Sequence, residues 1–178
     1  MRNSAGVTFV ELLISLSLIA IVGTLAAPGF SNLLYDSRRT ATVNDFFHAL
    51  FLARSAAITR GKVVSVCRST DRETCAGRAV PWTAGWIVFA NDDRDEPPQR
   101  DPGEDLIAAY SGWPRGEITS NRAAYSFRPH MQGVVNGTIV FCDPRGSAHA
   151  RAIIISHSGR PRVSRRGANN EALRCASG

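Results

Sequence analysis

The chain opens with a long stretch of apolar side chains. In the 24 residues from Val7 to Phe30, Glu11 is the only ionisable side chain. At about 1.5 Å per residue, a helix of that length is roughly 36 Å long, enough to cross a hydrocarbon core of about 30 Å. A lone carboxylate in such a segment costs on the order of 2.5 kcal/mol or more unless something compensates it. The pattern predicts an apolar helix whose single acid has a functional role.

Beyond Pro28 and Gly29, the helical pattern resumes and becomes amphipathic. Apolar residues between Val43 and Ile58 recur at three-to-four spacing, which is typical of a helix that packs one face on a core. Gly61 is a signal for the end of the helix, and the proline bends or interrupts it. We predict one long helix, bent near Pro28, that runs from near the amino terminus to about residue 60.

Short β-rich segments fill the rest of the chain, separated by clusters of Gly, Pro, Asn and Asp. A helix followed by strands alone predicts an α+β fold in which an antiparallel sheet is laid on the helix. The expected strands are 63–67, 86–90, 106–110, 123–127, 138–142 and 152–156, with 162–163 as a last short strand.

The chain has four cysteines, an even number that suits an oxidising compartment outside the cytoplasm. Cys67 and Cys75 could close a small loop, while Cys142 and Cys175 would tie the C-terminal segment back to a strand. Four cysteines allow three connectivities, so the sequence leaves the pairing open. Zinc is the rival use, but the sequence has no CxxC pair and its four histidines are scattered. We therefore expect no metal site and no cofactor.

An acidic run lies in the middle of the chain. Residues 92–105 hold seven acidic and two basic side chains, a net charge of −5. Carboxylates are calcium ligands, but the glycine and terminal glutamate of an EF-hand loop are absent and prolines interrupt the run. We favour a solvated loop over an ion site.

The C-terminal part of the chain is basic. Residues 142–178 hold seven arginines and two acids, a net charge of +5, and the densest part is 159–167. The arginine side chain suits a phosphate backbone because its planar fork of donors stays charged and matches phosphate oxygens. Arginine outnumbers lysine 20 to 1 in this chain, so genome composition is a competing explanation of the patch.

Three interpretations fit the amino-terminal segment. A secretory signal peptide has a shorter apolar run, and a plain membrane anchor leaves Glu11 without a partner. The third rests on Gly6-Val7-Thr8-Phe9-Val10-Glu11 before an apolar helix, which resembles the processing site of type IV prepilins. The resemblance implies cleavage after Gly6 and N-methylation of Val7, with Glu11 and Pro28 at family positions. The first mature residue is commonly Phe in that family, and here it is Val.

The prepilin resemblance gives Glu11 a role. Cleavage creates an α-ammonium at Val7, and Glu11 of a neighbouring subunit can pair with it in a filament core, where each charge offsets the desolvation of the other. Glu11 is then an assembly residue. The implied domains are a leader (1–6), a transmembrane and filament-core helix (7–35), and an amphipathic helix with a β-rich periplasmic domain (36–178). The implied partners are prepilin peptidase, other pilin subunits and, before assembly, the inner membrane.

Further motifs are similar to the minor pilins of the GspH/FimT family. They are Gly85–Phe89 followed by the acidic Asn91–Asp95, Phe127-Arg128-Pro129 followed by Gly133, and Gly159-Arg160-Pro161-Arg162. The last resembles the Gly-Arg-x-Arg motif with which FimT-type minor pilins bind DNA for uptake. The resemblance implies a type IV pilin-like fold and double-stranded DNA as a partner.

On this resemblance, the DNA-binding residues are Arg160, Arg162, Arg165 and Arg166, and the subunit serves natural transformation in an extracellular pilus, at or near its tip. The alternative is a structural minor pilin or GspH-like pseudopilin that primes or caps a filament without binding DNA. The sequence holds no HExxH or nucleophile-elbow motif, so we expect no enzyme.

Overall fold

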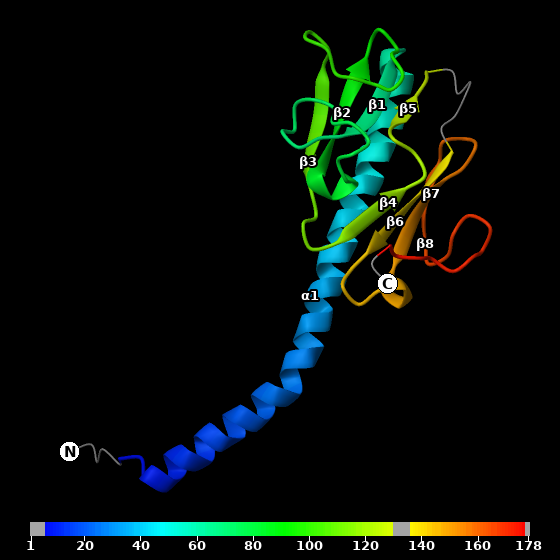
Figure 1. Ribbon diagram of the computed structural model, residues 1–178. Helices are drawn as coiled ribbons and strands as arrows, with labels where there is room; N and C mark the ends of the chain where they lie inside the picture. Colours follow the sequence, from blue (N-terminus) through cyan, green and yellow to red (C-terminus); the bar gives the residue numbers. More distant parts are fainter. Residues whose placement is uncertain (1–5, 130–135, 177–178) are drawn as a thin grey trace. The chain divides into compact units, whose positions relative to one another are not determined.

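The computed structural model describes residues 6–129 and 136–176, without the side chains of residues 25–28. The chain divides into two compact units, Met1–Arg38 and Arg39–Gly178, and the helix α1 (Phe9–Arg60) contributes to both (Figure 1). The predicted domain boundaries after residues 6 and 35 stay predictions, and residues 1–5 of the predicted leader, like Gly133, lie outside the described ones.

The first unit consists of the beginning of α1, whose side chains from Phe9 to Thr24 are exposed. Hydroxyl groups in this apolar stretch bond back to the helix, as Ser17 Oγ does to the carbonyl of Leu13 at 2.8 Å. No single helix in the described ranges is long and apolar enough to cross a membrane. Phe9–Thr24 and Gly29–Arg60 meet that test together as a bent pair. The bend expected near Pro28 falls between them, but the Pro28 side chain is not among those described.

The second unit contains two antiparallel sheets of four strands each, where one sheet was expected. The strand order in the first sheet is β3-β2-β1-β5 (Figure 1). Its strands are close to the predicted ones, except that the last begins two residues later than expected because residues 121–124 form a bend. They are β1 (Val63–Arg68), β2 (Gly85–Asn91), β3 (Leu106–Ser111) and β5 (Tyr125–Phe127).

The strand order in the second sheet is β4-β6-β7-β8. The chain therefore passes from the second sheet at β4 to the first at β5 and back at β6, which sequence spacing does not reveal. The strand β4 was missed because three of its four residues are polar and only Ile118 is buried. The strands are β4 (Glu117–Ser120), β6 (Gly137–Cys142), β7 (Arg151–Ile155) and β8 (Pro161–Ser164).

Both sheets meet the amphipathic part of α1 in one hydrophobic core. Phe46 of α1 is fully buried there, with ring centroids 4.8 Å from Trp86, 5.2 Å from Trp82 and 5.7 Å from Phe141. The pairs with Trp82 and Phe141 are edge-to-face, and such pairs add about 0.5–1.5 kcal/mol each beyond the area they bury. The three-to-four stripe predicted from the sequence is thus the face that packs on both sheets, except that Ile58 at its end is exposed.

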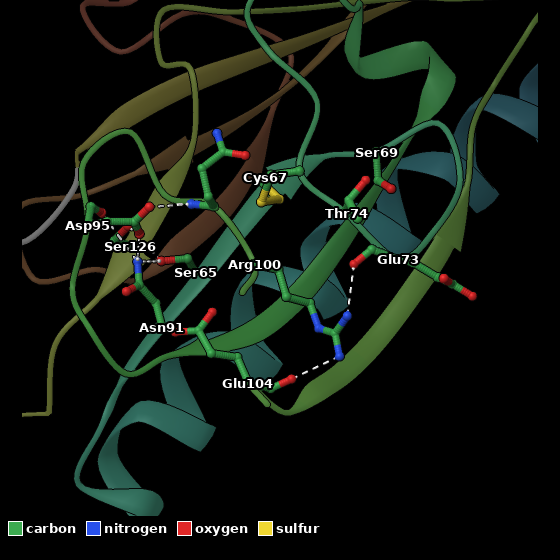
Figure 2. The surroundings of a disulfide bond; sticks show 12 residues. Ser65, Cys67, Ser69, Glu73, Thr74, Asn91, Asp95, Arg100, Glu104 and Ser126 are labelled. Atoms are coloured by element: carbon green, nitrogen blue, oxygen red, sulfur yellow. Dashed lines mark hydrogen bonds between the residues drawn. A yellow bond between two sulfur atoms is a disulfide. The ribbon is translucent and has the colours of Figure 1, made fainter. Parts of the chain in front are cut away.

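Two loops cover the face of the first sheet that points away from this core (Figure 2). The disulfide Cys67–Cys75 holds the loop after β1. Arg100 joins that loop to the acidic one, because its guanidinium donates to the carbonyls of Glu73 at 3.2 Å and Glu104 at 2.9 Å. The covered face is therefore fixed by covalent and polar links as well as by apolar packing.

Candidate nucleic-acid interface

The basic motif Gly159-Arg160-Pro161-Arg162 forms the end of the turn between β7 and β8 and the first two residues of β8. The N–H of Gly159 donates to the carbonyl of Ser156 at 2.8 Å, and the N–H of Ser156 donates to the carbonyl of Arg160 at 3.1 Å. Gly159 has a φ of 71°, in the left-handed region that favours glycine. A three-residue loop with a left-handed glycine is a common tight hairpin connection. The glycine therefore sets where the first arginine of the motif leaves the turn.

Pro161 suits the outer strand of the sheet, because among the strands of the described ranges β8 pairs with β7 alone. Pro161 lies opposite Ile155 and Arg162 lies opposite Ile154. A proline lacks the N–H that an inner strand would need, so it is tolerated at an edge, where it also blocks pairing with another chain. The motif thus combines a turn glycine, an edge proline and two arginines on an extended segment.

Four arginines of this segment are exposed: Arg160, Arg162, Arg165 and Arg166. Within the described part of the chain, the guanidinium groups of the first three meet no hydrogen-bond or ion-pair partner. Arg166 donates from Nη1 to the carbonyl of Asn170 at 3.0 Å, so it also closes the following turn. Arg160 immediately precedes β8 and Arg162 lies on it, within the roughly 6.6–6.8 Å that two extended residues span, so the two arginines can meet successive groups of one ligand.

The segment is anchored at its far end. Cys142 of β6 forms a disulfide with Cys175, and both pack in a small apolar cluster with Ile154 and Leu173. The N–H of Cys175 also donates to the hydroxyl of Ser147 at 3.1 Å. These links hold the chain after the hairpin against the face of the second sheet on which Ile154 and Arg162 lie. The arginines are therefore carried by a fixed scaffold.

Other basic residues of the C-terminal part serve the fold. Asp143 is buried and accepts from Arg145 Nη2 at 2.7 Å and from Arg39 Nη1 of α1 at 3.0 Å. Burial acts to raise the pKa of the Asp143 carboxyl, but the hydrogen bonds and charges of Arg145, with the charge of Arg39, outweigh it and hold that pKa below its ordinary value. Arg151 donates to the carbonyl of Ala150 at 2.8 Å. Sequence reasoning counted Arg145 and Arg151 in the basic region without seeing these internal roles.

The acidic run 92–105 forms an ordered loop that uses its carboxylates internally. Glu104 is buried and accepts the N–H groups of Asp92 at 2.6 Å and Asp101 at 3.0 Å. Asp95 accepts from the side chain of Asn91 at 3.0 Å (Figure 2). Three of its acids also pair with basic residues outside the run: Lys62–Asp92, Arg60–Asp105 and Arg128–Glu96. No group of three or more metal-ligating side chains occurs among the residues that the structure describes.

The predicted processing residues lie at the start of the first unit. Gly6 and Val7 precede α1 and are exposed, and Glu11 is in the first turn of the helix, also exposed. The N–H of Glu11 donates to the hydroxyl of Thr8 at 3.3 Å. Thr8 and Glu11 have the spacing of a helix capping box, a signal that sequence reasoning missed. Glu11 is thus suited to the positive end of the helix before any filament forms.

A long amino-terminal helix whose second half packs on antiparallel sheets defines a type IV pilin-like protein. Two family models match the sequence: one described as type II transport protein GspH, over residues 42–159, and one described as the prokaryotic N-terminal methylation motif, over residues 1–27. The chain belongs to the GspH family. It is a minor pilin or pseudopilin of a type IV pilus or a type II secretion system, and proteins of this kind are structural subunits. No curated protein sequence matches the chain.

Solved structures share the fold at low sequence identity. The crystal structure of the type IV minor pilin FimU from Pseudomonas aeruginosa has a TM-score of 0.50 and 14% identity, covering 75% of this chain and 90% of that one. The minor pseudopilin EpsH of the type 2 secretion system of Vibrio cholerae has a TM-score of 0.48 and 10% identity, covering 71% and 96%. The likeness to FimU confirms the predicted α+β, pilin-like fold.

Proposed function

We propose that this minor pilin binds double-stranded DNA without sequence preference through Arg160, Arg162, Arg165 and Arg166, and that it serves DNA uptake in natural transformation. The observation that carries the proposal is the contrast among the C-terminal arginines. Those at residues 145 and 151 are engaged inside the fold, whereas Arg160, Arg162 and Arg165 are exposed and, in the described ranges, unpaired.

The surroundings of these arginines favour a polyanion. No acidic residue occurs between residues 156 and 170, so nothing in the segment neutralises the arginines. The hairpin is already closed by backbone hydrogen bonds, which lowers the ordering cost of binding. The same stretch contains no Phe, Tyr or Trp for base stacking. Phosphate contacts alone carry no base information, so a duplex of any sequence should bind.

A second candidate function is structural: a subunit that primes or caps a filament and binds no DNA. One observation favours it. Proline and charged side chains on an edge strand prevent unwanted strand pairing, and β8 is an edge strand that carries Pro161 and Arg162. Edge protection alone requires neither a cluster of four arginines nor any affinity for phosphate, so a binding measurement separates the two functions.

The assembly proposal completes the function. We propose that prepilin peptidase cleaves after Gly6, that Val7 is then methylated, and that the new terminus pairs with Glu11 of a neighbouring subunit. Before assembly, the subunit sits in the inner membrane with its domain in the periplasm, and afterwards it sits at or near the tip of the pilus. The methylation motif match over residues 1–27 supports this route.

Fluorescence anisotropy with a labelled duplex of random sequence tests DNA binding on a protein that begins at residue 36. We expect Arg160→Gln with Arg162→Gln to weaken strongly the binding seen at low salt, with only Arg165 and Arg166 left to contact phosphates. The matched control is Arg72→Gln with Arg115→Gln, which removes the same charge from exposed arginines elsewhere on the domain. The proposal would be contradicted if the unmodified domain caused no anisotropy change at low salt, or if the control variant lost as much DNA affinity as the Arg160 and Arg162 variant.

A further inference from the structure

The edge strand β5 lies beside a pocket that none of the functions above uses. The pocket has a volume of about 370 Å³, and its lining includes Arg78, Glu96, Pro97, Pro98, Arg122 and Ser126; it is called the β5 pocket below. A volume of this size lies within the usual range for ligand sites. The lining comes from the segment after Cys75 (Arg78), from the acidic loop (Glu96–Pro98), and from β5 and the residues before it.

Two arginines give the β5 pocket a positive wall. Arg122 is oriented in advance, because its Nε donates to the carbonyl of Asn136 at 2.9 Å and its Nη2 to the side-chain oxygen of Asn136 at 2.6 Å. Arg78 is exposed and, in the part of the chain that the structure describes, has no hydrogen-bond or ion-pair partner. Glu96, the one acid among the described lining residues, lies 3.5 Å from a guanidinium nitrogen of Arg128. The pocket therefore keeps a positive balance.

A third arginine strengthens this field from inside the domain. Arg68 is buried, lies 4.8 Å from the centre of the Trp82 ring and donates to the carbonyl of Arg122 at 3.5 Å, so its described partners are not anions. Burial, and after it the charge of Arg78, lowers the pKa of the Arg68 guanidinium. Like charges held close together raise the local affinity for an anion.

We propose that the β5 pocket binds an extended peptide segment of a partner protein through one carboxylate of that segment. The carboxylate pairs with Arg78 and Arg122, and the neighbouring peptide groups lie along β5, the end strand of the first sheet, against the prolines. Arginine forks match a carboxylate in two-point geometry, and addition of an extended peptide to a sheet edge is a known mode of recognition. The acidic loop beside the pocket, with its net charge of −5, disfavours a polyanion such as DNA there but tolerates one carboxylate.

The test uses the full chain in detergent micelles and a dye-labelled peptide, Val-Thr-Val-Asp-Val-Thr, blocked at both ends. The control peptide has Asn in place of Asp. We expect fluorescence anisotropy to show binding of the Asp peptide that weakens about tenfold for the Asn peptide and about tenfold for Arg78→Gln, the value of a charge-assisted hydrogen bond. Arg115→Gln, an exposed arginine outside the pocket, should bind the Asp peptide normally.

Other results would overturn the proposal. No anisotropy change of a trace of labelled Asp peptide as the protein is raised to about 100 μM shows that the site is not a peptide site. Equal binding of the two peptides shows that the carboxylate is not recognised. Arg160→Gln with Arg162→Gln should leave peptide binding intact, so this inference and the DNA proposal fail separately. If the double variant still binds a labelled duplex and Arg78→Gln abolishes that binding, the pocket is a nucleic-acid site.

Discussion

Replacing Arg160 and Arg162 by glutamine should halve the salt dependence of DNA binding. Each arginine that neutralises a phosphate releases condensed counterions, and the logarithm of the binding constant falls with the logarithm of salt concentration by about 0.9 per contact. Both side chains are exposed and, among the described residues, unpaired, so neither gives up an internal contact to reach a phosphate. The substitution keeps a polar side chain but shortens it, and it removes both the charge and the guanidinium fork.

The expected magnitude follows from the number of arginines proposed to bind. Four phosphate contacts give a slope of about −3.6, so raising the salt from about 50 to about 200 mM should weaken binding about 150-fold. With Arg165 and Arg166 left, the slope should be about −1.8 and the same change should weaken binding about 12-fold. If Arg166 keeps its bond to the Asn170 carbonyl in the complex, the unmodified protein loses about one contact and its slope is shallower by about 0.9.

Anisotropy titrations of one labelled duplex at four or five salt concentrations measure both slopes. A second duplex of unrelated sequence should give the same values, because phosphate contacts carry no base information. Weaker binding by the variant with an unchanged slope would refute the reasoning, since the two arginines would then support the fold of the hairpin without contacting phosphate. Circular dichroism melts of both proteins provide the control for folding.

Three further predictions concern the scaffold of the site and use the protein that begins at residue 36. Gly159→Ala should destabilise the domain by about 1–2 kcal/mol in urea unfolding, because alanine disfavours the left-handed turn conformation, and it should also weaken DNA binding; unchanged stability would contradict the turn geometry. Asp143→Asn should cost about 3–5 kcal/mol near neutral pH, because it leaves two arginines without their buried acid. Because the pKa of Asp143 is lower in the folded protein, its ionised carboxylate stabilises the fold above the unfolded pKa of about 3.9, and this stabilisation is lost as the pH falls through the folded value. The difference in the free energy of unfolding between the two proteins should therefore narrow below about pH 4. Replacing Cys142 and Cys175 by serine should lower the free energy of unfolding by about 3.8 kcal/mol in the chain-entropy model and change DNA affinity little, because the hairpin is closed by its own backbone bonds; an equal loss of affinity and stability would show that the disulfide shapes the site.

The candidate site was predictable in part. A run of arginines around Gly159 and Pro161 is visible in the sequence, and both residues take the turn and edge positions that suit them. The opposite roles of Arg145 and Arg162 are not visible there. Both are arginines in a basic segment, but a buried carboxylate two residues before Arg145 accepts its hydrogen bonds, whereas Arg162 lies on an outer strand. Partners from the rest of the fold decide which charge is available.

The roles of the acidic residues in the acidic loop also depend on partners elsewhere in the fold. Its composition indicates a solvated loop, yet Glu104 is buried and holds two backbone N–H groups, while Arg100 links it to the disulfide loop. The sequence does not distinguish a buried carboxylate that stabilises the fold from one that is exposed to water. Only the positions of neighbouring backbone groups distinguish them.

The sequence by itself determined the long helix, its apolar and amphipathic halves, most strands and the prepilin-like start, because periodicity and local turn chemistry are properties of adjacent residues. Tertiary structure alone decided that the strands form two sheets, that β4 and β5 belong to different ones, and that Arg39 of α1 meets Asp143 across 104 positions. It also placed Arg78 and Arg122 on one pocket. These outcomes depend on contacts between distant segments, whose free energy is shared among many partners and leaves no periodic trace along the chain.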